Sequence, residues 1–313
     1  MDKPSPTQIW LAQFRANFLI LAVLLVAIGL ALSYKHLLEV NGHFNWLSAI
    51  LLLIGSVSAH SSVNLFNEYS DFKTKIDFNT LRNPFSGGSG MLPGGNTKPG
   101  NVLFAAILTL IISAAIGVYF SFVSHWSIAL TIIIGGFAIV FYTEFLAKVL
   151  LGEFFAGFAL GSLVVMGVYI AMTAHPQMTL ADLLPNEVWL LSIPPGILTS
   201  LLLFINEFPD MEADKAGGRH HLVIRFGRKV SGYLYALGLV AVYLIVILLP
   251  IFHISSYWTY LALLTLPIAV KVSSTAIKDY DNMEKIIPAL GQNVLIVLGT
   301  DLLIASAVML QLI

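Results

Sequence analysis

Long uncharged apolar stretches alternate with short polar stretches along the whole chain. The uncharged stretches cover residues 16–34, 40–67, 99–143, 154–181, 188–206, 230–270 and 286–313, the last interrupted by Asp301. About 20 apolar residues are needed to cross a bilayer core. The third and sixth stretches are each long enough for two crossings, with turns near residues 124–127 and 250–257. The pattern therefore predicts nine membrane-spanning segments.

The apolar runs are continuous and do not alternate every second residue, so helices are favoured over the strands of a barrel. The first run is longer than the apolar part of a signal peptide and eight more spans follow it, so we interpret it as an anchor. The predicted fold is an all-α polytopic membrane protein. Its nine helices form a bundle around a central cavity, and residues 1–313 form one domain.

Composition supports this class of protein. Of 313 residues, 58% are hydrophobic and 11% are charged, against about 25% charged in soluble domains. The net charge of −1 argues against a nucleic-acid partner. The chain has no cysteine, which excludes disulfides, thiolate metal sites and cysteine nucleophiles.

Basic residues divide unevenly between the two ends of the predicted spans. Lys35 alone falls on one face. The other face carries Lys3, Arg15, Lys73, Lys75, Arg82, Lys98, Lys148, Lys215, Arg219, Arg225, Arg228, Lys229, Lys271, Lys278 and Lys285. Positive charge marks the cytoplasmic side, so we expect a cytoplasmic N-terminus and a lipid bilayer as the surrounding phase.

One short pattern occurs twice on that face. Residues 67–71 read Asn-Glu-Tyr-Ser-Asp, and residues 206–210 read Asn-Glu-Phe-Pro-Asp. Each copy closes an apolar span and has another acid close behind, Asp77 in the first and Asp214 in the second. The repeat suggests two related halves, about 1–150 and 151–313, that face one cavity.

The spacing of these residues brings their side chains together. Asn206, Asp210 and Asp214 are four residues apart, so they share one face of a helix with 3.6 residues per turn. Asn67 and Asp71 share a face in the same way, but Asp77 joins them only if the helix has ended by then.

Carboxylates crowded at a membrane surface call for a cation. Mg²⁺ bound by a few carboxylates usually completes its shell with water and substrate phosphates. A single acidic loop would more simply be a solvated one, but two matching copies on one face favour a metal site that handles diphosphates.

Basic residues near the acids suit diphosphate oxygens. They are Lys148, Arg82, Lys73 and Arg219, although each also fits ordinary charge topology. The glycine-rich residues 86–90 could bring backbone N–H groups to a phosphate.

Other polar residues are given structural roles. We expect His60 to be a satisfied histidine within the membrane and His220-His221 to belong to an interfacial loop. Asp301 lies in mid-span, where a polar interior contact is expected.

The two motifs resemble those of the UbiA superfamily of intramembrane prenyltransferases. Its first motif reads Asn-Asp-x-x-Asp with a further Asp, and its second Asn-x-x-x-Asp-x-x-x-Asp. The six-residue step from Asp71 to Asp77 is similar to the branch that prenylates 1,4-dihydroxy-2-naphthoate for menaquinone, as are residues 142–153 and 86–90. Glu68, Lys75 and the proline-free residues 144–147 depart from the usual pattern.

The resemblance implies an enzyme that transfers a polyprenyl group from its diphosphate to an aromatic acceptor. It implies that two Mg²⁺ ions are held by Asn67, Asp71, Asp77, Asn206, Asp210 and Asp214. The four aspartates and Lys148 would act in catalysis, while Asn67, Asn206, Arg82, Lys73 and Arg219 would bind the diphosphate.

The site would lie on the cytoplasmic side of a bacterial or archaeal cell membrane. Alternatives are another acceptor (4-hydroxybenzoate, homogentisate or a glycerol phosphate lipid), terpene cyclisation, and transport.

Overall fold

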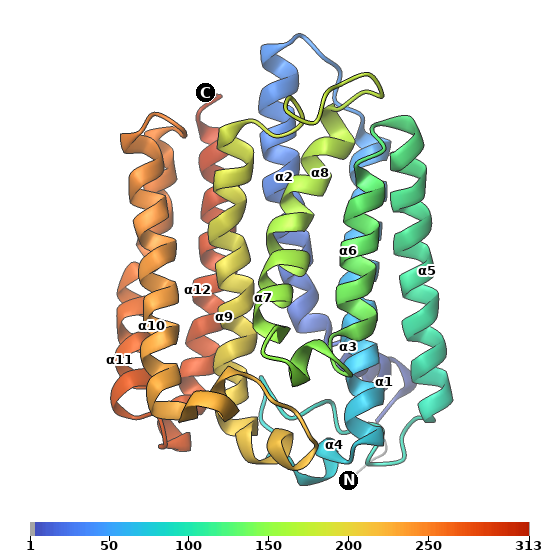
Figure 1. Ribbon diagram of the computed structural model, residues 1–313, viewed down its shortest axis with the longest axis vertical. Coiled ribbons are helices and arrows are strands. Elements are labelled where there is room, and N and C mark those ends of the chain that lie inside the picture. The colour runs from blue at the N-terminus through green and yellow to red at the C-terminus, as the bar shows by residue number, and fades with distance from the viewer. Residues whose placement is uncertain (1–3, 313) are drawn as a thin grey trace.

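The computed structural model describes residues 4–312, which form long helices running side by side (Figure 1). The α-helices are α1 (Pro6–Gln13), α2 (Leu19–Glu39), α3 (Trp46–Lys73), α4 (Ile76–Asn79), α5 (Pro99–Val123), α6 (Ile128–Phe141), α7 (Gly152–Gly157), α8 (Leu163–Thr173), α9 (Asn186–Ala216), α10 (Leu222–Ile251), α11 (Leu266–Lys278) and α12 (Met283–Leu310). Three short 3₁₀ segments are η1 (Ala16–Phe18), η2 (Leu146–Lys148) and η4 (Tyr257–Thr265), and η3 (Phe158–Ser162) is a π-helix.

The all-α membrane fold is confirmed. Within residues 4–312, eight helical segments are long and apolar enough to cross a membrane. The remaining predicted span is α6, an apolar helix of only 14 residues, so the count of nine stays a prediction. The expected turns are present, because α5 ends before residues 124–127 and α10 ends just after Pro250.

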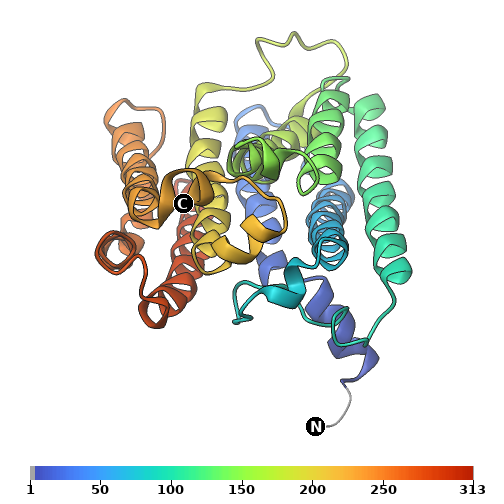
Figure 2. The same ribbon diagram turned by 60° about the horizontal axis from the view of Figure 1, so that its bottom comes forward.

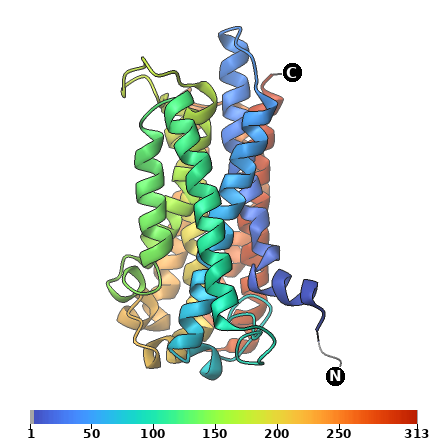
Figure 3. The same ribbon diagram turned by 90° about the vertical axis from the view of Figure 1, so that its right-hand side faces the viewer.

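The two ends of the bundle carry different parts of the chain (Figure 3). The N-terminal segment and α4 lie at one end, and the C-terminus lies at the other (Figure 1). Lys35, the one basic residue assigned to the second end, forms an ion pair with Glu187 at 2.6 Å. Lys3 lies outside the described residues. Which end is cytoplasmic stays a prediction.

The largest buried apolar cluster joins α2 to the C-terminal helices. Its fully buried members include Leu25, Leu198, Tyr235 and Ile296, from α2, α9, α10 and α12. A smaller cluster around Leu65 joins α3 to α5. Viewed with the lower end forward, α4 and the chain after α9 lie at the near end of the bundle (Figure 2).

Close packing fixes α7 and η3 against α9. A Cβ atom at Gly157 would lie 2.6 Å from the carbonyl oxygen of Gly196, and one at Gly161 would lie 2.7 Å from the Gly196 Cα. Only glycine allows this close approach, and the contact sets one wall of a cavity at the end of the bundle that carries α4.

Candidate functional site

The first acidic segment spans the end of α3 and the turn after it. Asn67 and Asp71 lie in the last turns of α3, and the Asn67 amide donates to Asp71 Oδ2 at 3.1 Å. The helix ends at Lys73, and Lys75 adopts a left-handed φ of 63°. This reversal begins α4, which carries Asp77 back to the same side as the α3 residues. Helix α3 therefore ends before Asp77, which is the condition for Asp77 to join Asn67 and Asp71 at one site.

The second acidic segment lies within one helix. Asn206, Asp210 and Asp214 all belong to α9, which runs on to Ala216 even though it contains Pro209. Their four-residue spacing places them along one face. Both acidic segments line a single cavity at this end of the bundle.

Arg219 joins the two segments. Its guanidinium pairs with Asp71, pairs with Asp214 Oδ1 at 2.7 Å, and donates to Asn67 Oδ1 at 2.9 Å. Burial opposes the charged form of this group, but the carboxylates of Asp71 and Asp214 outweigh it and raise the pKa of Arg219 above its usual range. The two acidic segments therefore converge on one cation from the chain itself.

The glycine-rich loop closes the cavity beside Asp77 and Asp210. Ser86 Oγ donates to Asp210 Oδ1 at 3.2 Å. Gly88 has φ +71°, and a Cβ there would collide with Asp77 Oδ1. Burial, reinforced by the nearby carboxylates of Asp71 and Glu68, raises the pKa of Asp77 to about 7.

The donor set fits a hard divalent cation. Asp77 Oδ2 and Asn206 Oδ1 are buried and have no hydrogen-bond partner among the described residues. Carboxylate and amide oxygens are the ligands that Mg²⁺ accepts, so these two atoms and their neighbours could hold the ion.

The other basic residues proposed from the sequence lie outside the cavity lining, whereas Asn67 and Asn206 are part of it. Arg82 donates to the backbone oxygen of Asp77 at 2.8 Å, Lys73 lies 5.0 Å from the centre of the Tyr69 ring, and Lys148 pairs with Glu144 at 3.2 Å. Of the four basic residues proposed from the sequence, the structure brings Arg219 alone into the cavity. Arg15 also lines the cavity, although the sequence indicated only its part in the uneven distribution of basic residues.

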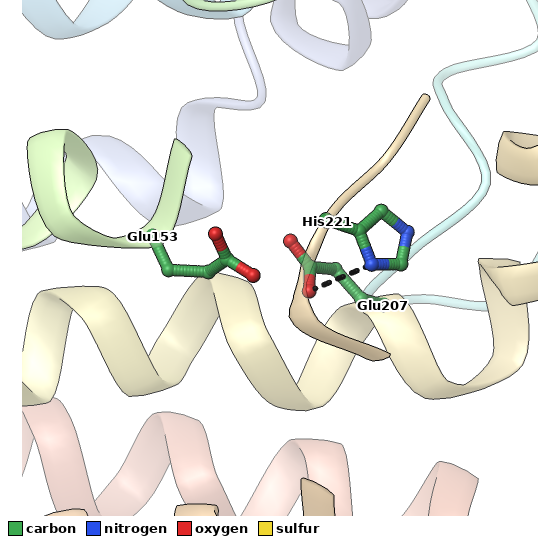
Figure 4. A group of neighbouring side chains, drawn as sticks. All are labelled: Glu153, Glu207 and His221. Atoms are coloured by element: carbon green, nitrogen blue, oxygen red, sulfur yellow. Dashed lines mark ion pairs between the residues drawn. The ribbon is translucent and has the colours of Figure 1, made fainter. Parts of the chain in front are cut away.

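A second group of titratable side chains adjoins Asp214. Glu153, Glu207 and His221 are all buried, and their ligand atoms lie within 4.8 Å of one another (Figure 4). His221 Nδ1 lies 3.2 Å from Glu207 Oε2, and Nε2 lies 3.2 Å from Asp214 Oδ2. Both ring nitrogens therefore lie close to carboxylate oxygens, and Nδ1 also accepts a hydrogen bond from the backbone N–H of Ile224 at 3.4 Å.

His221 lies in the loop before α10, as expected, but it is buried and lines the cavity. The signal for Glu207 was already in the repeated pattern, because Glu68 occupies the same position in the first copy. Both side chains are buried. Glu68 accepts hydrogen bonds from the backbone and hydroxyl of Ser89.

Two further expectations were wrong. His60 lines the cavity, and its Nε2 has no hydrogen-bond partner among the described residues, so it is not satisfied by its neighbours. Asp301 is fully buried, but neither of its carboxylate oxygens has a partner there. No contact among the described residues accounts for the burial of this carboxyl group.

A second cavity lies deeper among the helices. It is lined mainly by small and apolar residues of α3, α5, α6 and α8, including Gly55, Gly117 and Val164. Leu160, in η3, lines both cavities. The polar site therefore adjoins a space suited to a hydrocarbon chain.

Comparison with known proteins gives consistent matches. Residues 22–289 match the UbiA prenyltransferase family. A 1,4-dihydroxy-2-naphthoate octaprenyltransferase from Bacillus subtilis strain 168 is 30% identical over 241 residues, covering 76% of this chain and 74% of that protein. The enzyme of the same name from Escherichia coli strain K12 is 27% identical over 88% of this chain and 87% of its own length.

Solved structures share the fold. The apo structure of a UbiA homolog from Aeropyrum pernix K1 matches with a TM-score of 0.73 and 16% identity, covering 95% of this chain and 98% of that one. A UbiA homolog from Archaeoglobus fulgidus, described as bound to DMAPP and Mg²⁺, matches with a TM-score of 0.52 and 15% identity over 96% and 98% of the two chains.

Proposed function

The chain belongs to the UbiA prenyltransferase family, and from this premise we propose that it transfers a polyprenyl group from its diphosphate to 1,4-dihydroxy-2-naphthoate. The bacterial relatives carry that acceptor in their names at 27–30% identity. The observation that carries the proposal is the convergence of both acidic segments, bridged by Arg219, on one cavity.

The proposed metal site uses Asn67, Asp71, Asp77, Asn206, Asp210 and Asp214. Two Mg²⁺ ions are proposed because each acidic segment supplies its own set of oxygens, and a related protein is described as bound to Mg²⁺ with a prenyl diphosphate. When bound, Mg²⁺ supplies Lewis-acid stabilisation of the charge that develops on the diphosphate.

Arg219 is proposed to bind the diphosphate directly. Its guanidinium already lies between Asp71 and Asp214, and Arg suits bidentate binding of phosphate oxygens. Donors placed where negative charge develops stabilise the transition state. As the bond between the prenyl carbon and its oxygen breaks, the guanidinium would hold the leaving diphosphate.

The rest of the cavity shields the reacting carbon from water. Phe18, Phe85 and Tyr142 line it, and aromatic faces stabilise nearby positive charge by roughly 0.5–2 kcal/mol each. The electron-rich acceptor ring would attack the allylic carbon, and the attacked ring carbon would then lose its proton, or its carboxyl group as carbon dioxide, to restore the aromatic ring. The apolar cavity beyond Leu160 would take the hydrocarbon chain.

An acceptor screen tests the proposal. Purified protein with Mg²⁺ and a labelled prenyl diphosphate should release diphosphate only when an aromatic acceptor is added, and fastest with 1,4-dihydroxy-2-naphthoate. Faster turnover of 4-hydroxybenzoate, homogentisate or a glycerol phosphate lipid would reassign the acceptor. Release with a cyclic hydrocarbon product would indicate cyclisation, and uptake into vesicles without turnover would indicate transport.

Two substitutions test the metal ligands. Asp71→Asn and Asp210→Asn should each lower turnover by at least about a hundredfold while the protein still folds and inserts. Asp281→Asn is the matched control, because this carboxylate is exposed at a surface pair with Arg228. Full activity of either site variant would remove that residue from the metal site.

A further inference from the structure

His60 lines the cavity at a greater depth than the acidic residues. It lies seven residues before Asn67 on α3, which is two helical turns, so the two side chains share a face about 10 Å apart. Its exposed fraction is only 6%, yet it lines the cavity. The residue therefore lies well below the metal-binding oxygens, toward the membrane interior.

The surroundings leave part of its ring without a partner. The imidazole faces the backbone of Leu160 in the π-helical turn η3, and π-helical turns are frequent at functional sites. Nε2 is buried and has no hydrogen-bond partner among the described residues.

Two polar side chains near His60 in the cavity lining already bond to the backbone. Asn64, one turn further along α3, donates to the carbonyl oxygen of Phe14 at 3.0 Å. The hydroxyl of Thr199 donates to the carbonyl oxygen of Pro195 at 2.8 Å. A buried polar group without a partner is unfavourable, so a polar group of a bound ligand is a suitable partner for the imidazole.

The substrates differ in what they can offer this atom. A prenyl chain is a hydrocarbon and has no polar group to pair with the imidazole. The diphosphate would bind Arg219 and the Mg²⁺ ions held by the acids, which gather around Asn67, about 10 Å from His60 along α3. The aromatic acceptor is the remaining component, and its ring hydroxyls can donate to an imidazole nitrogen.

We propose that His60 is a specificity-determining residue whose imidazole forms a hydrogen bond with a ring hydroxyl of the aromatic acceptor. This bond orients the ring so that one carbon faces the allylic carbon of the prenyl group. The inference rests on the proposed function, since it needs a hydroxylated aromatic acceptor, but it adds the residue that recognises that acceptor.

Steady-state kinetics of His60→Leu and His60→Gln test the proposal, with 1,4-dihydroxy-2-naphthoate and its two monomethyl ethers as acceptors. His60→Leu should lower kcat/KM for the acceptor by about fivefold to a hundredfold and leave the KM for the prenyl diphosphate within about twofold. Gln keeps an oxygen acceptor and should recover part of the loss. His175→Gln, at an exposed loop at the other end of the bundle, should match the wild type.

The methyl ethers separate recognition from a purely structural role. The wild type should disfavour the ether that blocks the bonded hydroxyl, and His60→Leu should lose that preference. The assignment would be overturned if the wild type and His60→Leu showed the same selectivity between the two ethers. It would also be overturned if His60→Leu lowered kcat/KM equally for the acceptor and for the prenyl diphosphate. If the wild type itself transfers prenyl groups to no aromatic acceptor, the proposed function fails instead. If Leu prevents folding, His60→Phe provides the same comparison.

Discussion

At the scale of single residues, Arg219 is the main stabilising partner of the acidic cavity. It contacts Asn67, Asp71 and Asp214, and its side chain is mostly buried. Breaking a buried ion pair from one side leaves an uncompensated charge and costs about 3–5 kcal/mol. The protein without divalent metal should therefore depend strongly on this one side chain.

Replacing Arg219 by Gln should lower the thermal stability of the metal-free protein and abolish most activity. Added Mg²⁺ should raise the melting temperature of the variant more than that of the wild type, because the ion neutralises the same carboxylates. Thermal unfolding with EDTA and with Mg²⁺ measures both effects. Lys285→Gln, which removes an exposed pair with Asp279, should change little. If Mg²⁺ raised the melting temperatures of the variant and the wild type equally, the idea that Arg219 and Mg²⁺ neutralise the same carboxylates would be contradicted.

Asp77 predicts a pH dependence. Its pKa in the folded protein is about 7, above the ordinary value of 3.8, so the folded state holds the proton more tightly than the unfolded state. This contribution to stability is fully present below about pH 4 and is lost as pH rises through 7. A tenfold difference in proton affinity corresponds to about 1.4 kcal/mol, so the contribution is at most about 4 kcal/mol.

In EDTA, the free energy of unfolding of the wild type should fall between pH 5 and 8 more steeply than that of Asp77→Asn. Mg²⁺ affinity should rise over the same interval, because a ligand carboxylate must lose its proton before it binds the ion. Chemical unfolding and Mg²⁺ titrations at pH 6 and 8 measure these effects. Parallel pH profiles for the two proteins would show that Asp77 does not titrate in this range.

The sequence could identify the acids better than the bases. Helical spacing fixes where short side chains such as Asp210 and Asp214 point, so their convergence followed from the pattern. Arg and Lys have long flexible stems, and the sequence cannot tell that Arg219 turns into the cavity while Lys148 pairs with Glu144. The burial of His221 was not foreseen for a related reason, because the sequence cannot tell that the loop after α9 leaves His220 exposed and places His221 in the cavity lining.

At the scale of elements, the contact between η3 and α9 sets one wall of the cavity. Gly161 approaches Gly196 so closely that a Cβ would lie 2.7 Å from its Cα. Leu160 and Thr199 line the cavity on either side of this contact. Separation of the two elements should therefore affect both stability and the reaction.

Gly161→Ala should lower the melting temperature and also raise KM for the substrates, since the backbone must shift to make room. Gly100→Ala in α5 is a matched control, because nothing lies within 4 Å of a Cβ there, it lines neither cavity, and Ala favours helix more than Gly does. Differential scanning fluorimetry and acceptor kinetics report the two effects. A Gly161→Ala protein as stable and active as the control would show that α9 moves aside freely.

The elements were predicted to different degrees. Helix ends followed from charges and turn residues, so α5, α6 and α10 end close to the expected positions. The π-helical turn η3 was not foreseen, because residues 158–162 continue an apolar run with no local signal. Its form depends on packing against α9, which is a contact between distant segments.

At the scale of the whole molecule, hydropathy and the repeated motif were sufficient to predict the fold. Apolar runs dictate membrane helices because backbone groups must be paired inside the helix in lipid. The resemblance to the UbiA superfamily is confirmed by the family match over residues 22–289. The relation between the two halves, 1–150 and 151–313, and the count of nine spans stay predictions.

The orientation of the molecule can be tested with its own composition. The chain has no cysteine, so single cysteines report their position without background. Lys215 and Gln177 are both exposed, at the acidic end and the other end respectively. The excess of basic residues at the acidic end predicts that this end is cytoplasmic.

A membrane-impermeant maleimide should therefore label Gln177→Cys in intact cells and Lys215→Cys only after the membrane is opened. The cysteine-free protein is the control and should stay unlabelled in both conditions. The reverse pattern would place the diphosphate site outside the cytoplasm. That result would leave the site's chemistry unchanged but would require the diphosphate to reach the protein from the opposite side of the membrane.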